Sequence, residues 1–255
     1  DFREYSVAHT RRRLEYRRAL EGMSNYSEMQ HKVVYEPRFF EQILLDLSIN
    51  VTEMFRDPWF YKKVRQVVFP HLKTYPFVKV WHAGCSAGQE VYSMSILLEE
   101  EGMTDRTQLY ATDFNEAILE KAQKGIYPMD LVRQYTTNYQ ASGGTNSFSD
   151  YYTADYDHVI MQNRLRERVL FTPHNLATDG VFVEMNVIFC RNVLIYFNRE
   201  LQNKVFQLFY DSLVPGGFLC LGSKESLRFA DIANKFELVC EREKIYRKRR
   251  IVRND

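Results

Sequence analysis

Apolar residues recur along this chain with two spacings, and their order predicts where strands and helices fall. Short, almost wholly apolar runs are typical of buried strands, and longer segments of 3.6-residue period are typical of helices. We expect strands at residues 78–82, 109–112, 169–171, 187–190 and 218–221, the last after a Pro-Gly-Gly turn at 215–217, and helices at 90–101, 116–124 and 200–213. Strands that alternate with helices predict a parallel sheet.

The two ends of the chain depart from this alternation. The last apolar runs, 236–240 and 244–248, are joined by a short charged turn, which predicts an antiparallel pair at one edge of the sheet. Residues before 49 show no strand pattern, and we expect helices there at 11–23 and 37–47, with another at 59–72. The sequence therefore predicts a helical domain at 1–48, a linker at 49–58 that contributes to the site described below, and a main domain at 59–255.

Residues 126–168 interrupt the main domain. This segment is rich in Tyr, Ser, Thr and Asn and contains the pair Gly143-Gly144. A loop of this length without structure is improbable in a compact domain. We therefore expect an inserted subdomain, a small β-ribbon with a flexible tip near 141–147.

Composition limits the possible functions only broadly. Of 255 residues, 45% are hydrophobic and 26% charged, and the net charge of +1 gives no general attraction to nucleic acid. The sequence shows neither an apolar run long enough to span a bilayer nor a signal-peptide pattern, so we expect a cytoplasmic protein without direct membrane insertion. The absence of an initiator Met is typical of a segment of a longer protein. The cysteines lack metal-ligand spacing, and we expect reduced thiols and no metal.

The most informative motif is Gly84-Cys-Ser-Ala-Gly88, between a predicted strand and a predicted helix. Glycine lets the backbone approach a ligand closely, so we assign Gly84 to a binding turn. Asp113 ends the next strand, where a carboxylate holds ribose hydroxyls in nucleotide-binding sheets. These two positions predict a site for a nucleoside cofactor at the carboxyl edge of the sheet.

Other enzyme classes fit this motif less well. The Gly-x-Ser-x-Gly spacing also occurs in serine hydrolases, but no histidine follows His174 to serve as the last triad member. The turn lacks the third glycine of dinucleotide-binding loops and the Gly-Lys pair of P-loops. The looser glycine turn of class I methyltransferases, which bind S-adenosylmethionine, fits better. Arg191, directly after the strand at 187–190, indicates either a ligand contact or a salt bridge, because a buried charge needs a partner.

Taken together, the motifs resemble the chemotaxis receptor methyltransferases of the CheR type. The resemblance runs from about residue 5 to 249 and rests on the blocks Asn50-Val-Thr-Glu-Met-Phe-Arg56, Ala83-Gly-Cys-Ser-Ala-Gly-Gln-Glu90, Ala111-Thr-Asp113, His174-Asn-Leu176, Phe189-Cys-Arg-Asn-Val-Leu-Ile-Tyr-Phe197 and Leu221-Gly-Ser-Lys-Glu225. It implies a Rossmann-like class I methyltransferase fold, with a mostly parallel sheet and an antiparallel C-terminal edge, a small all-helical N-terminal domain and an inserted β-subdomain.

The resemblance also implies the residues of the site. The implied cofactor-binding residues are Asn50, Thr52, Arg56, Glu90, Asp113, Asn175, Leu176, Arg191 and Asn192. Arg56 and Tyr196 would lie nearest the transferred methyl group and form the catalytic pair. The implied product of S-adenosylmethionine is S-adenosylhomocysteine.

The implied reaction is methyl esterification of glutamate side chains on the cytoplasmic domains of chemotaxis receptors. A glutamate with an unperturbed pKa of about 4.3 is ionised at neutral pH, so no general base is required. A basic cluster of Arg11, Arg12, Arg13, Arg17 and Arg18 would dock against acidic receptor surfaces, unless it is only a solvated helix face. Two alternatives stay open, namely a methyltransferase for another substrate and a domain that senses S-adenosylmethionine without turnover.

Overall fold

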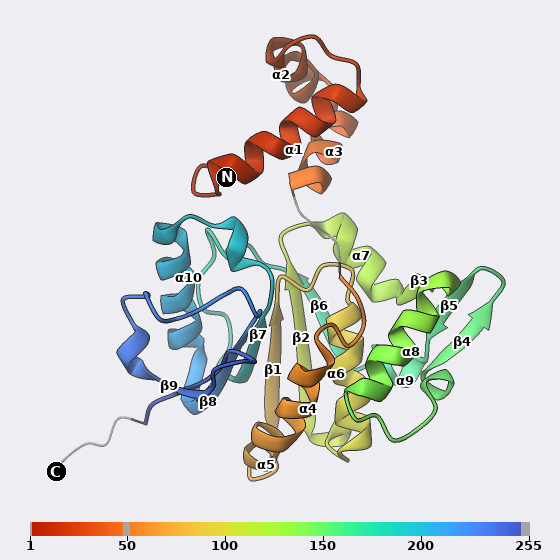
Figure 1. Cartoon of the computed structure of the whole chain (residues 1–255), viewed down its shortest axis with the longest axis vertical. Coiled ribbons are helices and arrows are strands. Elements are labelled where there is room, and N and C mark those ends of the chain that lie inside the picture. Colours follow the sequence, from red (N-terminus) through yellow and green to blue (C-terminus); the bar gives the residue numbers. More distant parts are fainter. Residues whose placement is uncertain (1, 48–51, 251–255) are drawn as a thin grey trace.

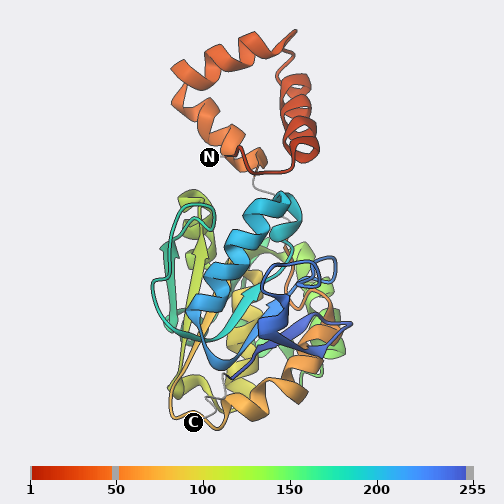
Figure 2. The same ribbon diagram turned by 90° about the vertical axis from the view of Figure 1, so that its left-hand side faces the viewer.

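The computed structural model describes residues 2–47 and 52–250. Helices α1 (Val7–Leu20), α2 (Tyr26–Tyr35) and α3 (Pro37–Leu47) form a layer at one end of the molecule (Figure 1), and Figure 2 shows them standing above the remainder. Their shared core contains Met23, Met29, Phe39, Ile43 and Leu47. We had not predicted α2, whose polar sequence gives little apolar period. Its N-cap residue is Asn25, whose side chain accepts a hydrogen bond from the N–H of Glu28.

The main sheet has the strand order β6-β2-β1-β7-β8-β10-β9. Its strands are β1 (Val78–Ala83), β2 (Thr107–Asp113), β6 (Val169–Pro173), β7 (Met185–Cys190), β8 (Leu213–Leu221), β9 (Phe236–Cys240) and β10 (Ile245–Lys248). The pairs from β6 to β8 are parallel, and β10 pairs antiparallel with both β8 and β9. The predicted fold class is confirmed. Strand β8 begins at Leu213, so the Pro-Gly-Gly segment that we expected before the strand lies within it, where the register with β7 shifts.

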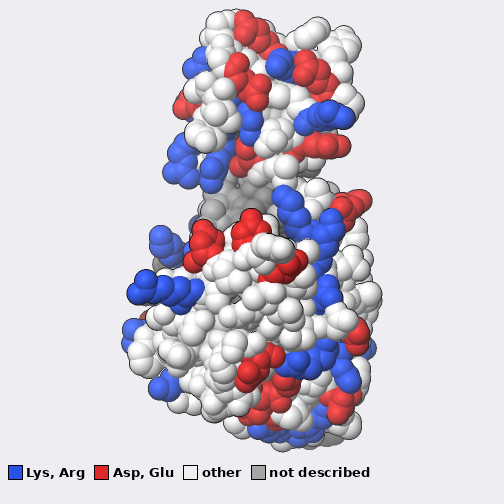
Figure 3. Space-filling view, turned by 90° about the vertical axis from the view of Figure 1, so that its right-hand side faces the viewer, with Lys and Arg blue, Asp and Glu red and all other residues white. Residues whose placement is uncertain are grey.

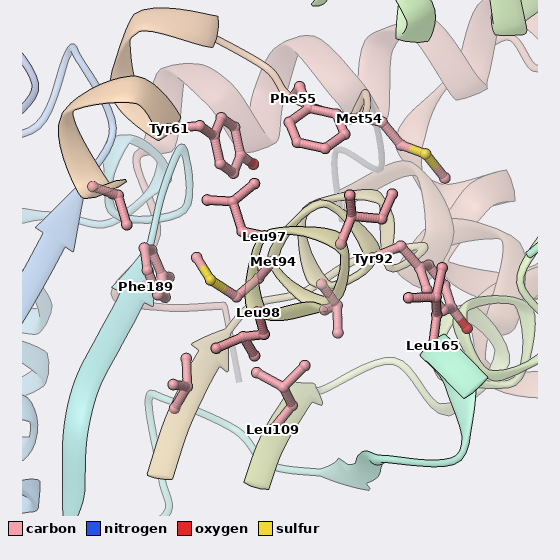
Figure 4. Packing of buried hydrophobic residues seen from close by; sticks show 14 of the residues in the cluster. Met54, Phe55, Tyr61, Tyr92, Met94, Leu97, Leu98, Leu109, Leu165 and Phe189 are labelled. Carbon is pink, nitrogen blue, oxygen red and sulfur yellow. The ribbon is translucent and has the colours of Figure 1, made fainter. Parts of the chain in front are cut away.

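Helices cover both faces of this sheet, because successive strand residues point to opposite sides. In β1, Val80 packs into the cluster under α4 (Pro58–Val67), α5 (Phe69–Leu72) and α6 (Gln89–Glu100), whereas its neighbour Trp81 packs toward α10 (Arg199–Ser212). Figure 4 shows Met94, Leu97 and Leu98 of α6 surrounded by side chains of the sheet and of α4. Helix α7 (Glu116–Lys124) follows β2 and packs near β6.

Residues 126–168 are the region where we expected a β-ribbon. Strands β3 (Ile126–Pro128), β5 (His158–Met161) and β4 (Tyr152–Asp155) pair antiparallel in that spatial order. The segment also contains helices α8 (Val132–Ala141) and α9 (Asn163–Arg166), which we had not predicted. The Thr- and Asn-rich sequence of α8 has low helix propensity, but the helix buries Tyr135 and Tyr139 against the main core. Short 3-10 turns occur at Thr104–Arg106, Met129–Leu131, Phe148–Tyr151, Leu194–Tyr196 and Ala233–Lys235.

Candidate functional site

The carboxyl ends of neighbouring strands bring the sequence motifs together. Strand β1 pairs with β2 on one side and with β7 on the other, so the segments after Ala83, Asp113 and Cys190 meet at one edge. A pocket opens there, the position at which open α/β sheets bind ligands. It is lined by Tyr5, Leu47, Thr52, Glu53, Arg56, Gly84, Cys85, Ser86, Glu90, Asp113, Phe114, His174, Asn175, Leu176, Arg191, Asn192, Val193, Tyr196 and Phe197.

Most of the residues proposed from the sequence lie in this pocket. The exception is Asn50, which lies outside the described residues. The lining also includes residues that we had not proposed. Some of them lie within the motif blocks quoted above or directly after one, so their proximity could have been inferred from the motifs: Cys85, Ser86, Phe114, His174, Val193 and Phe197. Tyr5 comes from the segment before α1 and Leu47 from the end of α3, and neither belongs to a local pattern that marks a site.

The glycine turn is tied to the end of β2. Gly84 has a φ of 76°, a conformation that favours glycine, and a Cβ atom there would lie 2.6 Å from Cγ2 of Val193. The N–H groups of Gly84 and Cys85 both donate to the Thr112 carbonyl at 2.8 Å. A side chain at position 84 would therefore be strained and would collide with Val193, which also lines the pocket.

Asp113 is buried at the end of β2 and is held by backbone donors. Its Oδ2 accepts from the N–H of Ser86 at 3.0 Å, and its Oδ1 accepts from the N–H of Asn115 at 3.1 Å. Burial raises the pKa of this carboxyl, while these N–H groups act to lower it. The carboxylate is thus fixed in orientation and keeps lone pairs for ligand hydroxyls.

Glu90 and Arg191 form the charged part of the pocket. Oε2 of Glu90 lies 3.2 Å from Nη1 of Arg191, and its Oε1 lies 2.9 Å from Nδ1 of the buried His82. Burial acts to raise the pKa of Glu90, but the hydrogen bonds and charges of His82 and Arg191 outweigh it, so the pKa is lowered. Nη2 of Arg191 pairs with Oδ2 of Asp57 at 2.7 Å, and its guanidinium lies 4.0 Å from the Phe60 ring centroid. Arg191 therefore forms a salt bridge and also lines the pocket, where its contact with a ligand stays a prediction.

The loop after β7 is held by Glu225, a residue to which we had assigned no role. The buried Glu225 carboxylate accepts hydrogen bonds from the N–H groups of Gly222, Asn192, Val193 and Leu194, at 2.6–3.0 Å. Asn192 has a φ of 62°, a rare conformation for a residue with a side chain. Phe55, Asp57 and Ser86 share this left-handed conformation. Such strained positions cluster at functional sites.

The helical domain touches the pocket through α1. The His9 ring lies 4.7 Å from the Tyr196 ring, centroid to centroid, and the N–H of Ser6 donates to the Tyr196 carbonyl at 2.8 Å. Tyr196 is only partly buried and faces the pocket. The proposed catalytic tyrosine therefore lies where the start of α1 meets the segment after β7.

The arginine cluster on α1 is not one docking face, which corrects our expectation. The side chain of Arg17 is only 9% exposed, because its guanidinium pairs with Asp46 of α3 and with Glu21. Arg18 donates to the carbonyls of Met23 and Ser24. Both therefore stabilise the helical domain, and only Arg11 and Arg12 are exposed, with Arg13 half-buried. Figure 3 shows cations and anions interspersed on the face it presents, so no broad basic surface covers that side.

The described residues show neither a metal-binding cluster nor a membrane-spanning helix. Within 2–47 and 52–250, no three His, Cys, Asp or Glu side chains gather as a group that could hold a metal ion. Over the same part of the chain, every helix is too short or too polar to cross a membrane.

Comparisons with known proteins agree with this geometry. A family model described as "CheR methyltransferase, SAM binding domain" matches residues 50–245. The chain is 48% identical to "Putative methyltransferase Cher3" of Pseudomonas putida over 97% of this chain and 91% of that protein. It is 31% identical to a chemotaxis protein methyltransferase of Vibrio parahaemolyticus over 76% of this chain and 70% of that protein.

A solved structure is also similar, at a much lower level. The crystal structure of the glycopeptide N-methyltransferase MtfA aligns with a TM-score of 0.39 and 10% sequence identity, over 64% of this chain and 52% of that chain. The chain thus spans about half the length of this solved structure.

Proposed function

The chain belongs to the CheR methyltransferase family, and we propose that it esterifies glutamate side chains of chemotaxis receptors with the methyl group of S-adenosylmethionine. The observation that carries the proposal is the convergence of Gly84, Asp113 and Arg191 on one pocket at the carboxyl edge of the sheet. The curated relatives named chemotaxis protein methyltransferases support the choice of substrate. The reaction is proposed to take place in the cytoplasm, on the receptors' cytoplasmic domains.

We assign the two ends of the pocket to the two parts of the cofactor. Asp113, held by backbone donors beside Asn175 and Leu176, would bind the adenosine portion through the ribose hydroxyls. The charged pair Glu90–Arg191, with Thr52, Arg56 and Asn192, would bind the methionine portion, which carries an ammonium and a carboxylate. Gly84 lines the same pocket, and its left-handed backbone and the close approach of Val193 leave no room there for a side chain.

The proposed reaction requires positioning more than proton transfer. Bound S-adenosylmethionine supplies a methyl group activated by a positively charged sulfur. The receptor carboxylate is already ionised near pH 7, so the residues of this chain would not need to remove a proton from it before it accepted the methyl group. Arg56 would orient the incoming carboxylate, and the Tyr196 hydroxyl would fix its line of approach. Enclosing the carboxylate between the two domains would remove part of its water shell.

The proposed partner surface is smaller than the sequence implied. Arg11 and Arg12 are exposed on α1, and α1 contacts Tyr196 through His9. These two arginines, with Arg13, would meet acidic side chains of the receptor beside the active site.

The decisive experiment is transfer of labelled methyl from S-adenosylmethionine to membranes that contain the receptors, followed by alkali. We expect label released as volatile methanol, because alkali hydrolyses a carboxyl methyl ester. Label that survives alkali would reject the glutamate substrate and indicate methylation of another group. Binding of cofactor without any label would favour a sensing domain. Asp113→Ala provides the matched control and should transfer no label.

A further inference from the structure

Residues 2–6 lie on the methyltransferase domain, although they precede the helical domain in the chain. The N–H of Asn198 donates to the Glu4 carbonyl at 2.8 Å, and the N–H of Ser6 donates to the Tyr196 carbonyl at the same distance. Between these bonds, Tyr5 forms an antiparallel bridge with Phe197. The segment is therefore fixed along the loop that follows β7.

This anchoring places the Tyr5 side chain in an aromatic cluster at the pocket. The Tyr5 ring centroid lies 4.8 Å from that of Phe2 and 4.9 Å from that of Phe197, both in edge-to-face geometry. Phe2 in turn lies 6.0 Å from Phe114, the residue after Asp113. Edge-to-face packing holds an aromatic ring in one orientation. Tyr5 is consequently a rigid part of the lining, on the same side as the end of β2.

The electrostatic setting of Tyr5 supports the same placement. Burial raises the pKa of its phenol, and the negative charge of Asp113 raises it further. The hydroxyl is therefore protonated at neutral pH and available as a donor.

We propose that Tyr5 is a cofactor-contacting residue that closes the pocket over the adenosine portion of S-adenosylmethionine. Its ring would cover the face of the adenosine away from Gly84, and its hydroxyl would donate to an oxygen or nitrogen of the nucleoside. A residue of the N-terminal segment then completes a site whose other parts come from the strand ends. The proposal depends on the proposed function only for the identity of the cofactor.

The test compares Tyr5→Ala and Tyr5→Phe by calorimetric binding of S-adenosylhomocysteine to the full chain. We expect Tyr5→Ala to weaken binding about tenfold and Tyr5→Phe about threefold, because the second variant keeps the ring. Tyr16→Ala serves as the control, because Tyr16 is 58% exposed on α1. The affinity of this variant for S-adenosylhomocysteine should be unchanged. Unchanged affinity in Tyr5→Ala would overturn the proposal.

A second ligand separates direct contact from a general disturbance of the pocket. 5′-Methylthioadenosine has the adenosine portion but lacks the amino-acid portion, so Tyr5→Ala should weaken both ligands by the same factor. A loss confined to S-adenosylhomocysteine would contradict the assignment to adenosine. In the unchanged protein, S-adenosylhomocysteine should also slow hydrogen exchange at the N–H of Ser6, and exchange that does not change would count against the proposal even if Tyr5→Ala did not fold. None of these measurements needs a receptor, so failure of receptor methylation would reject the proposed substrate alone.

Discussion

Glu90 and Arg191 are 101 positions apart in the chain, yet Oε2 of the first lies 3.2 Å from Nη1 of the second. The pair joins the first turn of α6 to the end of β7, on the two sides of the pocket. Arg191 also binds Asp57, the residue before α4. The two ion pairs of Arg191 therefore connect the segments after β1 and β7 to the segment that enters α4. The charges that link these segments therefore also line the pocket to which we assign the cofactor.

Glu90→Gln should lower stability in a pH-dependent way. Loss of the charged partner of a buried arginine should reduce the free energy of unfolding at pH 7 by about 1–3 kcal/mol. Since the pKa of Glu90 is lowered in the folded state, its contribution is present above its ordinary value of 4.5 and is lost as the pH falls through the lower folded value. The free energy of unfolding can be measured in urea at several pH values for the unchanged protein and for Glu90→Gln. The difference between their free energies should become smaller below pH 4.5. A difference that stays constant down to pH 3.5 would contradict this account.

Tyr196→Phe and Arg56→Ala should each reduce kcat for receptor methylation. Removal of one positioning group that acts in the transition state typically lowers kcat about tenfold or more. Tyr196→Phe keeps the ring against which His9 packs, so its KM for S-adenosylmethionine should stay within about twofold of that of the unchanged protein. Steady-state kinetics with receptor membranes gives both values. If both variants turned over at the normal rate, the assigned catalytic roles would be wrong.

Glu225→Gln should weaken cofactor binding, although Glu225 is proposed to act only through the loop after β7. An amide places two donors where a carboxylate accepts hydrogen bonds from Gly222, Asn192, Val193 and Leu194. Unfolding by urea should show a loss of about 1.5–3 kcal/mol, because hydrogen bonds to a charged group contribute that much. Affinity for S-adenosylhomocysteine should fall in the same variant. Glu225→Asp, which keeps the charge, should retain more of that affinity, and equal loss in both variants would argue against the role of the charge.

Charge reversal at Arg11 and Arg12 together should raise the KM for receptor several-fold and leave affinity for S-adenosylhomocysteine unchanged. Both arginines are exposed, so they contribute to receptor encounter more than to folding. The effect should diminish at high salt, because exposed charges are screened. The matched control is Arg242→Glu, whose side chain is 82% exposed in the turn between β9 and β10. Equal KM values for the double variant and this control would show that the two arginines do not dock the receptor and only form a solvated helix face.

The sequence determined the main sheet and most of the pocket, because both follow from local rules. Apolar period marks strands and helices, and parallel strands joined by helices bring their carboxyl ends to one edge. Gly84, Asp113 and Arg191 follow directly after predicted strands, so their approach could be anticipated without coordinates. The resemblance to a family then supplied the remaining candidates, among them Arg56 and Tyr196.

Only the tertiary structure decided which polar groups became partners. Arg17 belongs by sequence to a basic helix face, yet its contact with Asp46, 29 positions away, removes it from the surface. Glu225 meets the loop at Asn192 across 33 positions, and Tyr5 reaches the pocket beside Phe197. Helix α8 forms against its local propensity because its tyrosines are buried by distant residues. The physical reason is the same in each case, since burial and pairing depend on the arrangement of whole elements, which the period of a single segment does not encode.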